Sequence, residues 1–217
     1  MTAEPQVLST GRDILSIGPV MPVVVIDNVA DAVPLARALA RGGVRAMEIT
    51  LRTEAGLGAI ERVAAEVPET LVGAGTVTTP EEASAAHRAG ARFIVTPGAT
   101  DRLLGAVLDT GLPLLAGAST LTEILRLREH GQTAVKFFPA EASGGTAYLR
   151  AVAGPVPDIS FCPTGGITPA NATEYLALPN VGCVGGSWLT PKALVASGDW
   201  VAIEGLAAAA AGLAAGG

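Results

Sequence analysis

The sequence predicts a single α/β domain folded as a (β/α)8 barrel, and three observations favour this class. The 217 residues suit one barrel domain, and 49% hydrophobic residues supply a large core. Continuous apolar runs, typical of strands buried on both faces, alternate about eight times with helical patterns. The first run leads into Asp27-Asn28-Val29 instead of a glycine-rich phosphate turn, which disfavours an open doubly wound sheet.

The expected strands are short apolar runs, each ended by a break rich in glycine, threonine or proline. They cover residues 20–26, 46–50, 70–76, 92–96, 113–117, 134–141, 158–163 and 181–185. A parallel barrel places the carboxyl ends of all these strands at one mouth.

The helices between the strands carry recognisable start signals. Pro34 suits the first turn of a helix over 31–41 that stops at Gly42-Gly43, and Thr79-Pro80-Glu81-Glu82 is a capping box with proline at the first helical position. The other expected helices cover 54–67, 101–109, 146–153 and 199–214 and begin at Thr120 and at Thr168-Pro169. We expect one domain over 1–217, with the barrel at about 18–200, residues 1–12 loosely ordered, and a short N-terminal helix within 13–17 that closes one mouth.

Composition excludes several classes of function. A net charge of −6 argues against nucleic acid as a partner. The longest apolar runs are interrupted, and the N-terminus lacks a basic region followed by an apolar core, so we expect no membrane partner and a cytoplasmic location. Cys162 and Cys183 lie in strand-like runs and are expected to be reduced core residues. No cluster has metal-ligand spacing, and His87 and His130 lie on surface helix patterns, so we expect no metal.

Lys136 is the first candidate catalytic residue, because it lies in the middle of the apolar and aromatic run 134–141. Burial disfavours a charged amine, and a neutral amine can attack a ketone to form a Schiff base. Two structural alternatives remain: Lys136 closes an ion pair, or it extends from the strand end to solvent.

Polar residues at the ends of the other strands are expected to converge on Lys136. They are Glu48, Arg52, Thr76, Thr96-Pro97-Gly98, Thr164-Gly165-Gly166 and Gly185-Gly186-Ser187. Glu48 is a candidate proton shuttle, or alternatively a structural partner of Lys136 or Arg52. Arg52 is a candidate for bidentate binding of a carboxylate, or alternatively an ordinary surface residue.

The two double-glycine segments suggest a phosphate site. Barrels commonly bind phosphate with backbone N–H groups in the loops after strands seven and eight. Gly165, Gly166, Gly185 and Gly186 would let the backbone approach an anion, and Ser187 adds a hydroxyl donor. The alternative is that these glycines only permit tight turns.

Five segments together resemble a known family, the 2-keto-3-deoxy-6-phosphogluconate (KDPG) aldolases, which also handle 4-hydroxy-2-oxoglutarate (KHG). The resemblance runs from about Val20 to Trp200, and its most specific strings are KFFPAE and CPTGGI. The segments are 48–53, 72–76, 135–141, 161–167 and 184–188.

This resemblance implies a role for each matched position. Lys136 corresponds to the Schiff-base lysine and Glu48 to the proton-transfer group. The matched substrate contacts are Arg52 and Thr76 for the pyruvate carboxylate, Pro97 and Phe138 for the pocket, Thr164 for the keto acid, and Gly165, Gly166, Gly186 and Ser187 for the phosphate. The family also implies a homotrimer, no cofactor and a phosphorylated keto acid as substrate.

The expected activity is that of a class I aldolase, which cleaves KDPG to pyruvate and glyceraldehyde 3-phosphate, or KHG to pyruvate and glyoxylate. Two alternatives remain open. A phosphosugar isomerase or epimerase on the same barrel would use Glu48 as base and Lys136 as an electrostatic clamp. A non-catalytic module would bind a phosphorylated ligand without turnover.

Overall fold

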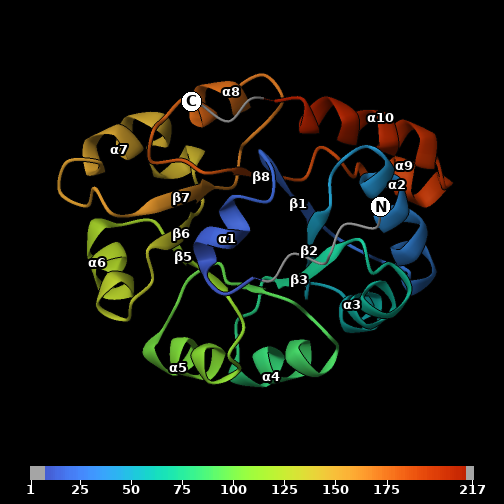
Figure 1. The fold of residues 1–217 in the computed structure, drawn as a ribbon, viewed down its shortest axis with the longest axis horizontal. Coiled ribbons are helices and arrows are strands. Elements are labelled where there is room, and N and C mark those ends of the chain that lie inside the picture. Colours follow the sequence, from blue (N-terminus) through green and yellow to red (C-terminus); the bar gives the residue numbers. More distant parts are fainter. Residues whose placement is uncertain (1–7, 214–217) are drawn as a thin grey trace.

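Eight parallel strands form the centre of the molecule, as the sequence predicts. The computed structural model describes residues 8–213. The strands run in the order β7-β6-β5-β4-β3-β2-β1-β8, and every paired neighbour is parallel. Two further parallel bridges, Phe161 with Val181 and Thr164 with Gly185, link the two ends of this series. The strands therefore form a nearly closed barrel inside a ring of helices (Figure 1).

The strands are short, and all but one of their residues are buried. Their bounds are β1 Val20–Val24, β2 Ala46–Thr50, β3 Leu71–Gly75, β4 Ile94–Val95, β5 Leu114–Ala118, β6 Ala134–Phe137, β7 Ser160–Pro163 and β8 Val184–Gly186. The predicted eighth strand, 181–185, is displaced toward the C-terminus. Val181 forms a parallel bridge with Phe161 near the start of β7, in which Phe161 N donates to Asn180 O and Gly182 N donates to Phe161 O. Pairing with β1 begins only at Val184.

The helices follow the strands in alternation. Their bounds are α1 Gly11–Leu15, η1 Val29–Asp31, α2 Ala32–Arg41, α3 Ala55–Glu66, α4 Pro80–Arg88, α5 Asp101–Asp109, α6 Leu121–Glu129, η2 Glu141–Ser143, α7 Gly145–Val152, α8 Ala172–Leu176, α9 Lys192–Ser197 and α10 Trp200–Ala211. The capping boxes expected at Thr79 and Thr120 are both present, with Glu82 and Glu123 as partners. Along the described residues, no helix is long and apolar enough to cross a membrane.

Two helix starts and one additional helix differ from the sequence expectation. The helix expected at Thr168 begins at Ala172, because the Asn171 side chain accepts from Thr168 N and donates to Gly166 O and so holds a turn first. The helix α9 was not expected. The helix α1 begins at Gly11, inside the segment expected to be loosely ordered, because Thr10 and Asp13 form a capping box. Residues 1–7 of that segment, and residue 214 of the expected last helix, lie outside the described residues.

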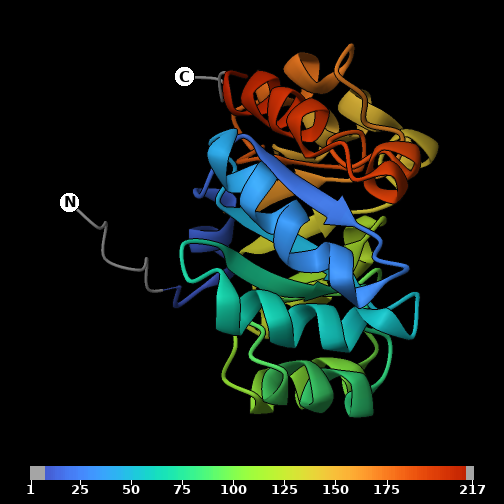
Figure 2. The same ribbon diagram turned by 90° about the vertical axis from the view of Figure 1, so that its right-hand side faces the viewer.

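The N-terminal helix α1 closes one mouth of the barrel, as predicted. Figure 1 shows α1 in the middle of the ring of strands, and Figure 2 shows β1 running away from the side on which α1 lies. Ile14 and Leu15 are buried against inward side chains that include Leu115, Ala134 and Cys162. The carboxyl ends of the strands therefore surround the opposite mouth.

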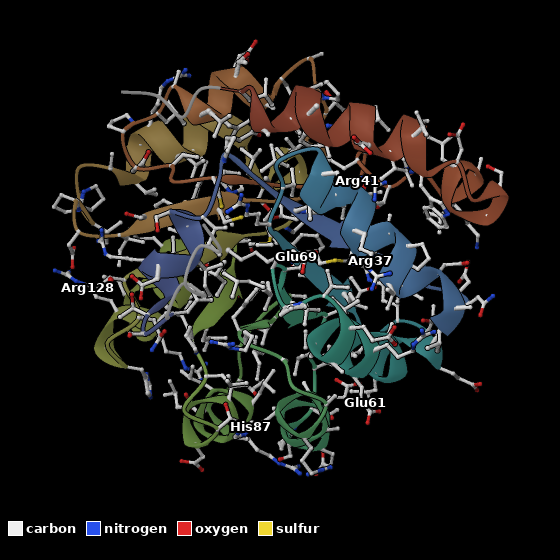
Figure 3. All side chains as sticks on the ribbon, turned by 45° about the vertical axis from the view of Figure 1, so that its right-hand side comes forward. Arg37, Arg41, Glu61, Glu69, His87 and Arg128 are labelled. Atoms are coloured by element: carbon white, nitrogen blue, oxygen red, sulfur yellow. The ribbon has the colours of Figure 1, made fainter. Side chains whose placement is uncertain are left out.

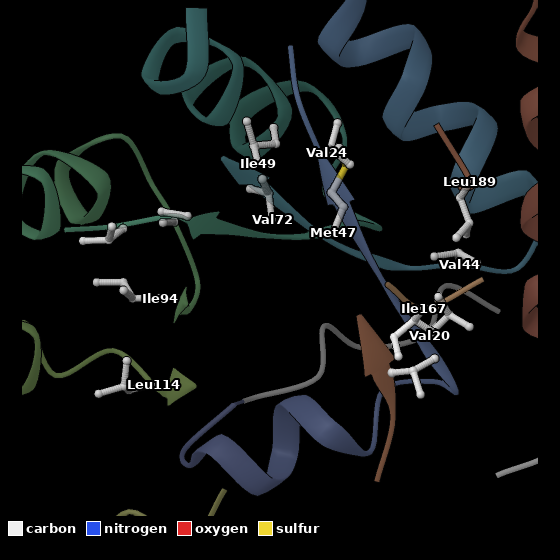
Figure 4. Close-up of a cluster of buried hydrophobic side chains, with 14 of the residues drawn as sticks. Val20, Val24, Val44, Met47, Ile49, Val72, Ile94, Leu114, Ile167 and Leu189 are labelled. Atoms are coloured by element: carbon white, nitrogen blue, oxygen red, sulfur yellow. The ribbon is translucent and has the colours of Figure 1, made fainter. Parts of the chain in front are cut away.

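Successive strand residues face two different cores. Val24, Ile49 and Val72 point outward from the strands into the layer beneath the helices (Figure 4). The residues before and after them in each strand point into the barrel. There the Phe93 ring occupies the space beside Gly73, which has no side chain. Because Met47 and Ile49 belong to the outer core, Glu48 between them points into the barrel.

The helix ring carries charged and titratable side chains on its outer surface. Figure 3 shows His87 on α4, Glu61 on α3 and Arg128 on α6, all on the outside of the molecule. His130 is also exposed. Both histidines therefore lie on the outer surface, as predicted.

Candidate active site

A buried ion pair lies across the interior of the barrel. The Nζ atom of Lys136 in β6 lies 3.1 Å from Oε1 of Glu48 in β2. The two side chains are only 4% and 3% exposed. A buried lysine needs such a partner, because an uncompensated charge in the interior is strongly destabilising. The same contact allows a proton to pass between the carboxylate and the amine.

A glycine on the neighbouring strand leaves room for the Glu48 carboxylate. Gly75 ends β3, and a Cβ atom there would lie 3.1 Å from Cδ of Glu48. This distance is shorter than most contacts of real Cβ atoms, so an alanine at 75 would push the carboxylate from its position. The glycine therefore has a packing role that the sequence pattern alone did not reveal.

Replacing Gly75 with alanine is expected to reduce activity by about tenfold and stability by about 1–3 kcal/mol, because it overpacks the site. Gly105→Ala is the matched control: this exposed glycine in α5 has nothing within 4 Å of an added Cβ. That control is expected to gain about 0.5–1 kcal/mol with unchanged activity. Enzyme assays and thermal unfolding of both variants test the pair. Equal activity of Gly75→Ala and the unmodified protein would contradict the packing argument.

An aromatic ring covers the lysine from the mouth side. The Phe138 ring follows β6, and its centroid lies 5.4 Å from Nζ of Lys136. A cation over a ring face at this distance is attracted by the ring quadrupole. Phe138 is half-buried, so the amine lies below the mouth rather than in open solvent.

Arg52 and Thr76 form a second pair at the rim. Arg52 Nε donates to Thr76 Oγ1 at 3.1 Å. Thr76 has φ of 57°, a left-handed conformation that is unusual for a β-branched residue and costs about 1–3 kcal/mol. Such strain persists where the surroundings impose it, and it commonly marks functional sites. The exposed guanidinium keeps donors free to bind a planar carboxylate in bidentate fashion.

Replacing Arg52 with lysine is expected to raise the KM of a keto-acid substrate about tenfold with little change in kcat. Lysine keeps the charge but lacks the planar fork that matches a carboxylate. Arg102→Lys, in an exposed pair with Glu81 on the outer surface, is the control and should leave both constants unchanged. Steady-state kinetics distinguishes the outcomes, and an unchanged KM in Arg52→Lys would remove Arg52 from the binding site.

The glycines after β7 and those near β8 have different environments. Gly165 and Gly166 follow β7 with φ of 97° and 81°, so they form a turn that other residues would strain. Gly185 was expected to end the eighth strand and Gly186 to follow it, whereas β8 extends to Gly186. Added Cβ atoms there would collide with the side chains of Thr164 and Trp188, so close packing explains both glycines.

The remaining predicted residues also lie at the open mouth. Thr164 is buried and bridges to Gly185, Pro97 follows β4 and is half-buried, and Ser187 follows β8 and is exposed.

Within residues 8–213 there is no group of three or more His, Cys, Asp or Glu side chains that could hold a metal ion.

Below the ion pair lie two thiols that the sequence predicted as core residues. Cys162 and Cys183 are free and buried. The pKa of the Cys183 thiol is raised well above its ordinary value, mainly by a hydrogen bond with Cys162 and secondly by burial. This thiol therefore stays protonated and packs as a small apolar group.

Two polar contacts near the mouth were missed by the sequence reasoning. Thr96 Oγ1 accepts from Gly117 N at 3.2 Å and so ties β4 to β5. The Tyr175 hydroxyl donates to Oε1 of Glu141, and these residues come from segments far apart in the sequence. Only the KFFPAE string, which contains Glu141, could have drawn attention to the second contact.

A barrel that holds a buried lysine against a carboxylate at its open mouth, with an arginine at the rim, defines a class: the lysine-dependent aldolases. The chain belongs within that class to the KDPG and KHG aldolase family, whose model matches residues 12–206. It is 52% identical over 207 residues to the 2-dehydro-3-deoxy-phosphogluconate aldolase of Pseudoalteromonas atlantica, covering 95% of this chain and 96% of that protein. It is 48% identical over 199 residues to the KHG/KDPG aldolase of Escherichia coli K12, covering 92% and 93%.

Solved structures show the same fold. The KDPG aldolase of Legionella pneumophila, captured with pyruvate as a covalent carbinolamine intermediate, superposes with a TM-score of 0.91 at 42% identity and covers 93% of this chain and 98% of its own. The aldolase of Zymomonas mobilis ZM4 with 3-phosphoglycerate superposes with a TM-score of 0.89 at 40% identity, covering 94% and 96%.

Proposed function

We propose that this chain is a class I aldolase that cleaves KDPG to pyruvate and glyceraldehyde 3-phosphate through an imine on Lys136, and KHG to pyruvate and glyoxylate as a second reaction. The observation that carries the proposal is the buried contact between Lys136 and Glu48 at the open mouth. The carbinolamine trapped in the Legionella relative supports the covalent mechanism.

The reaction begins when Glu48 takes a proton from the ammonium of Lys136, because only the neutral amine is nucleophilic. Nζ then attacks C2 of the keto acid to give a carbinolamine. Glu48 returns its proton to the carbinolamine hydroxyl, which leaves as water, so that a protonated imine and the Glu48 carboxylate remain. Glu48, directly or through water, removes the proton of the C4 hydroxyl. The C3–C4 bond breaks, its electron pair forms the enamine, and the aldehyde leaves.

The second half of the reaction returns the enzyme to its starting state. Glu48 gives the proton taken from the C4 hydroxyl to C3 of the enamine, which forms the protonated imine of pyruvate. Water then hydrolyses that imine, which releases pyruvate and restores the ammonium of Lys136 beside the Glu48 carboxylate. The cationic imine is itself the electron sink, so the scheme needs neither metal nor organic cofactor. We therefore expect the rate to be unchanged by excess EDTA.

Binding at both ends orients the substrate over the lysine. Arg52 and Thr76 bind the pyruvate carboxylate, Pro97 and Phe138 line the pocket, and Thr164 contacts the keto acid. The Gly165-Gly166 turn, the Gly185-Gly186 pair and Ser187 bind the phosphate through N–H and O–H donors. Gly185 and Gly186 also leave room for the neighbouring side chains. Holding both ends presents the C3–C4 bond to one amine and so removes much of the entropic barrier.

Cleavage assays on three substrates test the proposal. Purified protein is mixed with KDPG, with its galactonate stereoisomer or with KHG, and pyruvate release is followed as NADH consumption by added lactate dehydrogenase. We expect the highest kcat/KM for KDPG. Isomerisation or epimerisation of a phosphosugar without release of pyruvate would favour the isomerase alternative. Binding without turnover would favour the non-catalytic module.

We also propose that the chain assembles as a homotrimer in the cytoplasm. Its membership of this aldolase family supports the trimer, which light scattering would test. A particle three times the mass of one chain is expected, and a monomer at assay concentration would contradict it.

A further inference from the structure

A glutamate and a tyrosine meet behind the Gly165-Gly166 turn. Glu141 follows β6 in η2, and its Oε1 accepts a hydrogen bond from the hydroxyl of Tyr175 in α8. Tyr175 is only 1% exposed. The pKa of Tyr175 is raised above its ordinary value, mainly by burial and secondly by the hydrogen bond to Glu141. The hydroxyl therefore remains protonated and acts as a donor. The contact therefore persists throughout the physiological pH range.

The side chain of Glu141 packs directly on the turn. A Cβ atom at Gly166 would lie 2.5 Å from Cγ of Glu141, so the glutamate stem occupies the space beside this glycine. The backbones are also joined, since Glu141 N donates to Gly165 O at 3.1 Å and Ala140 N donates to Thr164 O at 2.8 Å. Glu141 thus braces a turn whose glycines would otherwise have wide conformational freedom.

The charge of Glu141 is directed away from the turn. A Cβ atom at Gly145, the first residue of α7, would lie 3.5 Å from Oε1 of Glu141 and 3.1 Å from the Tyr175 hydroxyl. The start of a helix favours a nearby negative charge. This arrangement keeps the carboxylate on the helix side, so the N–H groups of the turn remain available to a substrate anion.

We propose that Glu141, held by Tyr175, is a positioning residue that fixes the Gly165-Gly166 turn for the phosphate of the substrate and so makes the enzyme prefer phosphorylated keto acids. The proposal rests on the aldolase function proposed above. It assigns Glu141 no contact with the reacting atoms, which distinguishes it from Glu48.

The test compares Glu141→Ala, Glu141→Gln and Tyr175→Phe on two substrates that differ only in the phosphate, KDPG and 2-keto-3-deoxygluconate. Removing the brace frees the turn, which must then be ordered on binding, so Glu141→Ala and Tyr175→Phe should raise the KM of KDPG about tenfold with little change in kcat. Cleavage of the unphosphorylated substrate, and trapping of pyruvate alone by borohydride, should stay within about threefold of the unmodified protein.

The conservative variant separates bracing from charge. Glutamine keeps an oxygen that accepts from Tyr175 and the same stem against Gly166, so Glu141→Gln should retain the KM of the unmodified protein. Thermal unfolding of Tyr175→Phe checks that this buried substitution leaves the fold intact. If Tyr175→Phe is unfolded, the exposed substitution Glu141→Ala still tests the effect of the brace on KM.

Three results would overturn the proposal: an unchanged KM in Glu141→Ala, an equal loss on both substrates, or a Glu141→Gln variant as impaired as Glu141→Ala. Failure of the aldolase proposal looks different, because the unmodified protein would then cleave neither substrate and trap no pyruvate. That result would remove the basis of this inference as well.

Discussion

Replacing Lys136 with methionine is expected to lower the rate of KDPG cleavage by at least about 10^4-fold, because the other lysine of the chain, Lys192, is exposed and paired with Asp27 and so cannot replace the buried amine. Methionine retains most of the length and packing of the lysine stem. The measurement is pyruvate release under saturating substrate. Activity near that of the unmodified protein would exclude a covalent role for Lys136.

The same substitution is expected to affect stability as well. Methionine at this position leaves the Glu48 carboxylate in the interior without its partner. Losing one member of a buried pair costs about 3–5 kcal/mol. The double variant Lys136→Met/Glu48→Gln removes both charges and should recover most of that loss while remaining inactive. Urea unfolding of both variants measures the difference, and equal stability of the two would contradict the pairing argument.

Replacing Glu48 with glutamine is expected to lower kcat by about 10^2–10^4-fold, the range typical for loss of a positioned general base. Glutamine keeps an oxygen that can accept from Lys136, so the protein should still fold and bind pyruvate. Exchange of the methyl protons of pyruvate with D2O, followed by NMR, isolates the proton transfer at C3 and should slow by a similar factor.

A structural role for Glu48 gives the opposite pattern. With a structural role alone, kcat and the exchange rate would stay close to those of the unmodified protein, whatever the loss of stability. Glu81→Gln is the control, because Glu81 forms an exposed pair with Arg102 on the outer surface. This control should change neither quantity, since exposed ion pairs contribute little.

The barrel could be predicted from the sequence because its signals are local. Thr79 and Thr120 cap their helices within three residues of chain, and apolar runs mark buried strands without reference to distant contacts. The rule that strand ends carry the site then brought Lys136, Glu48 and Arg52 to one mouth.

Features that depend on long-range packing could not be predicted in this way. Gly185 and Gly186 resembled a turn at the end of a strand because nothing local shows that Thr164 and Trp188 occupy the space beside them. The helix expected at Thr168 was displaced by a side-chain turn built on Asn171. The contact between Glu141 and Tyr175 joins residues 34 positions apart, and no spacing rule connects them.

Mass spectrometry of the intact protein after incubation with pyruvate and sodium borohydride tests the central claim most directly. Borohydride reduces an imine to a stable secondary amine, so we expect one adduct per chain, located on Lys136 by peptide mapping. The adduct should be absent from Lys136→Met. A folded, unmodified protein that forms no adduct, or forms one at another lysine, would contradict the imine mechanism.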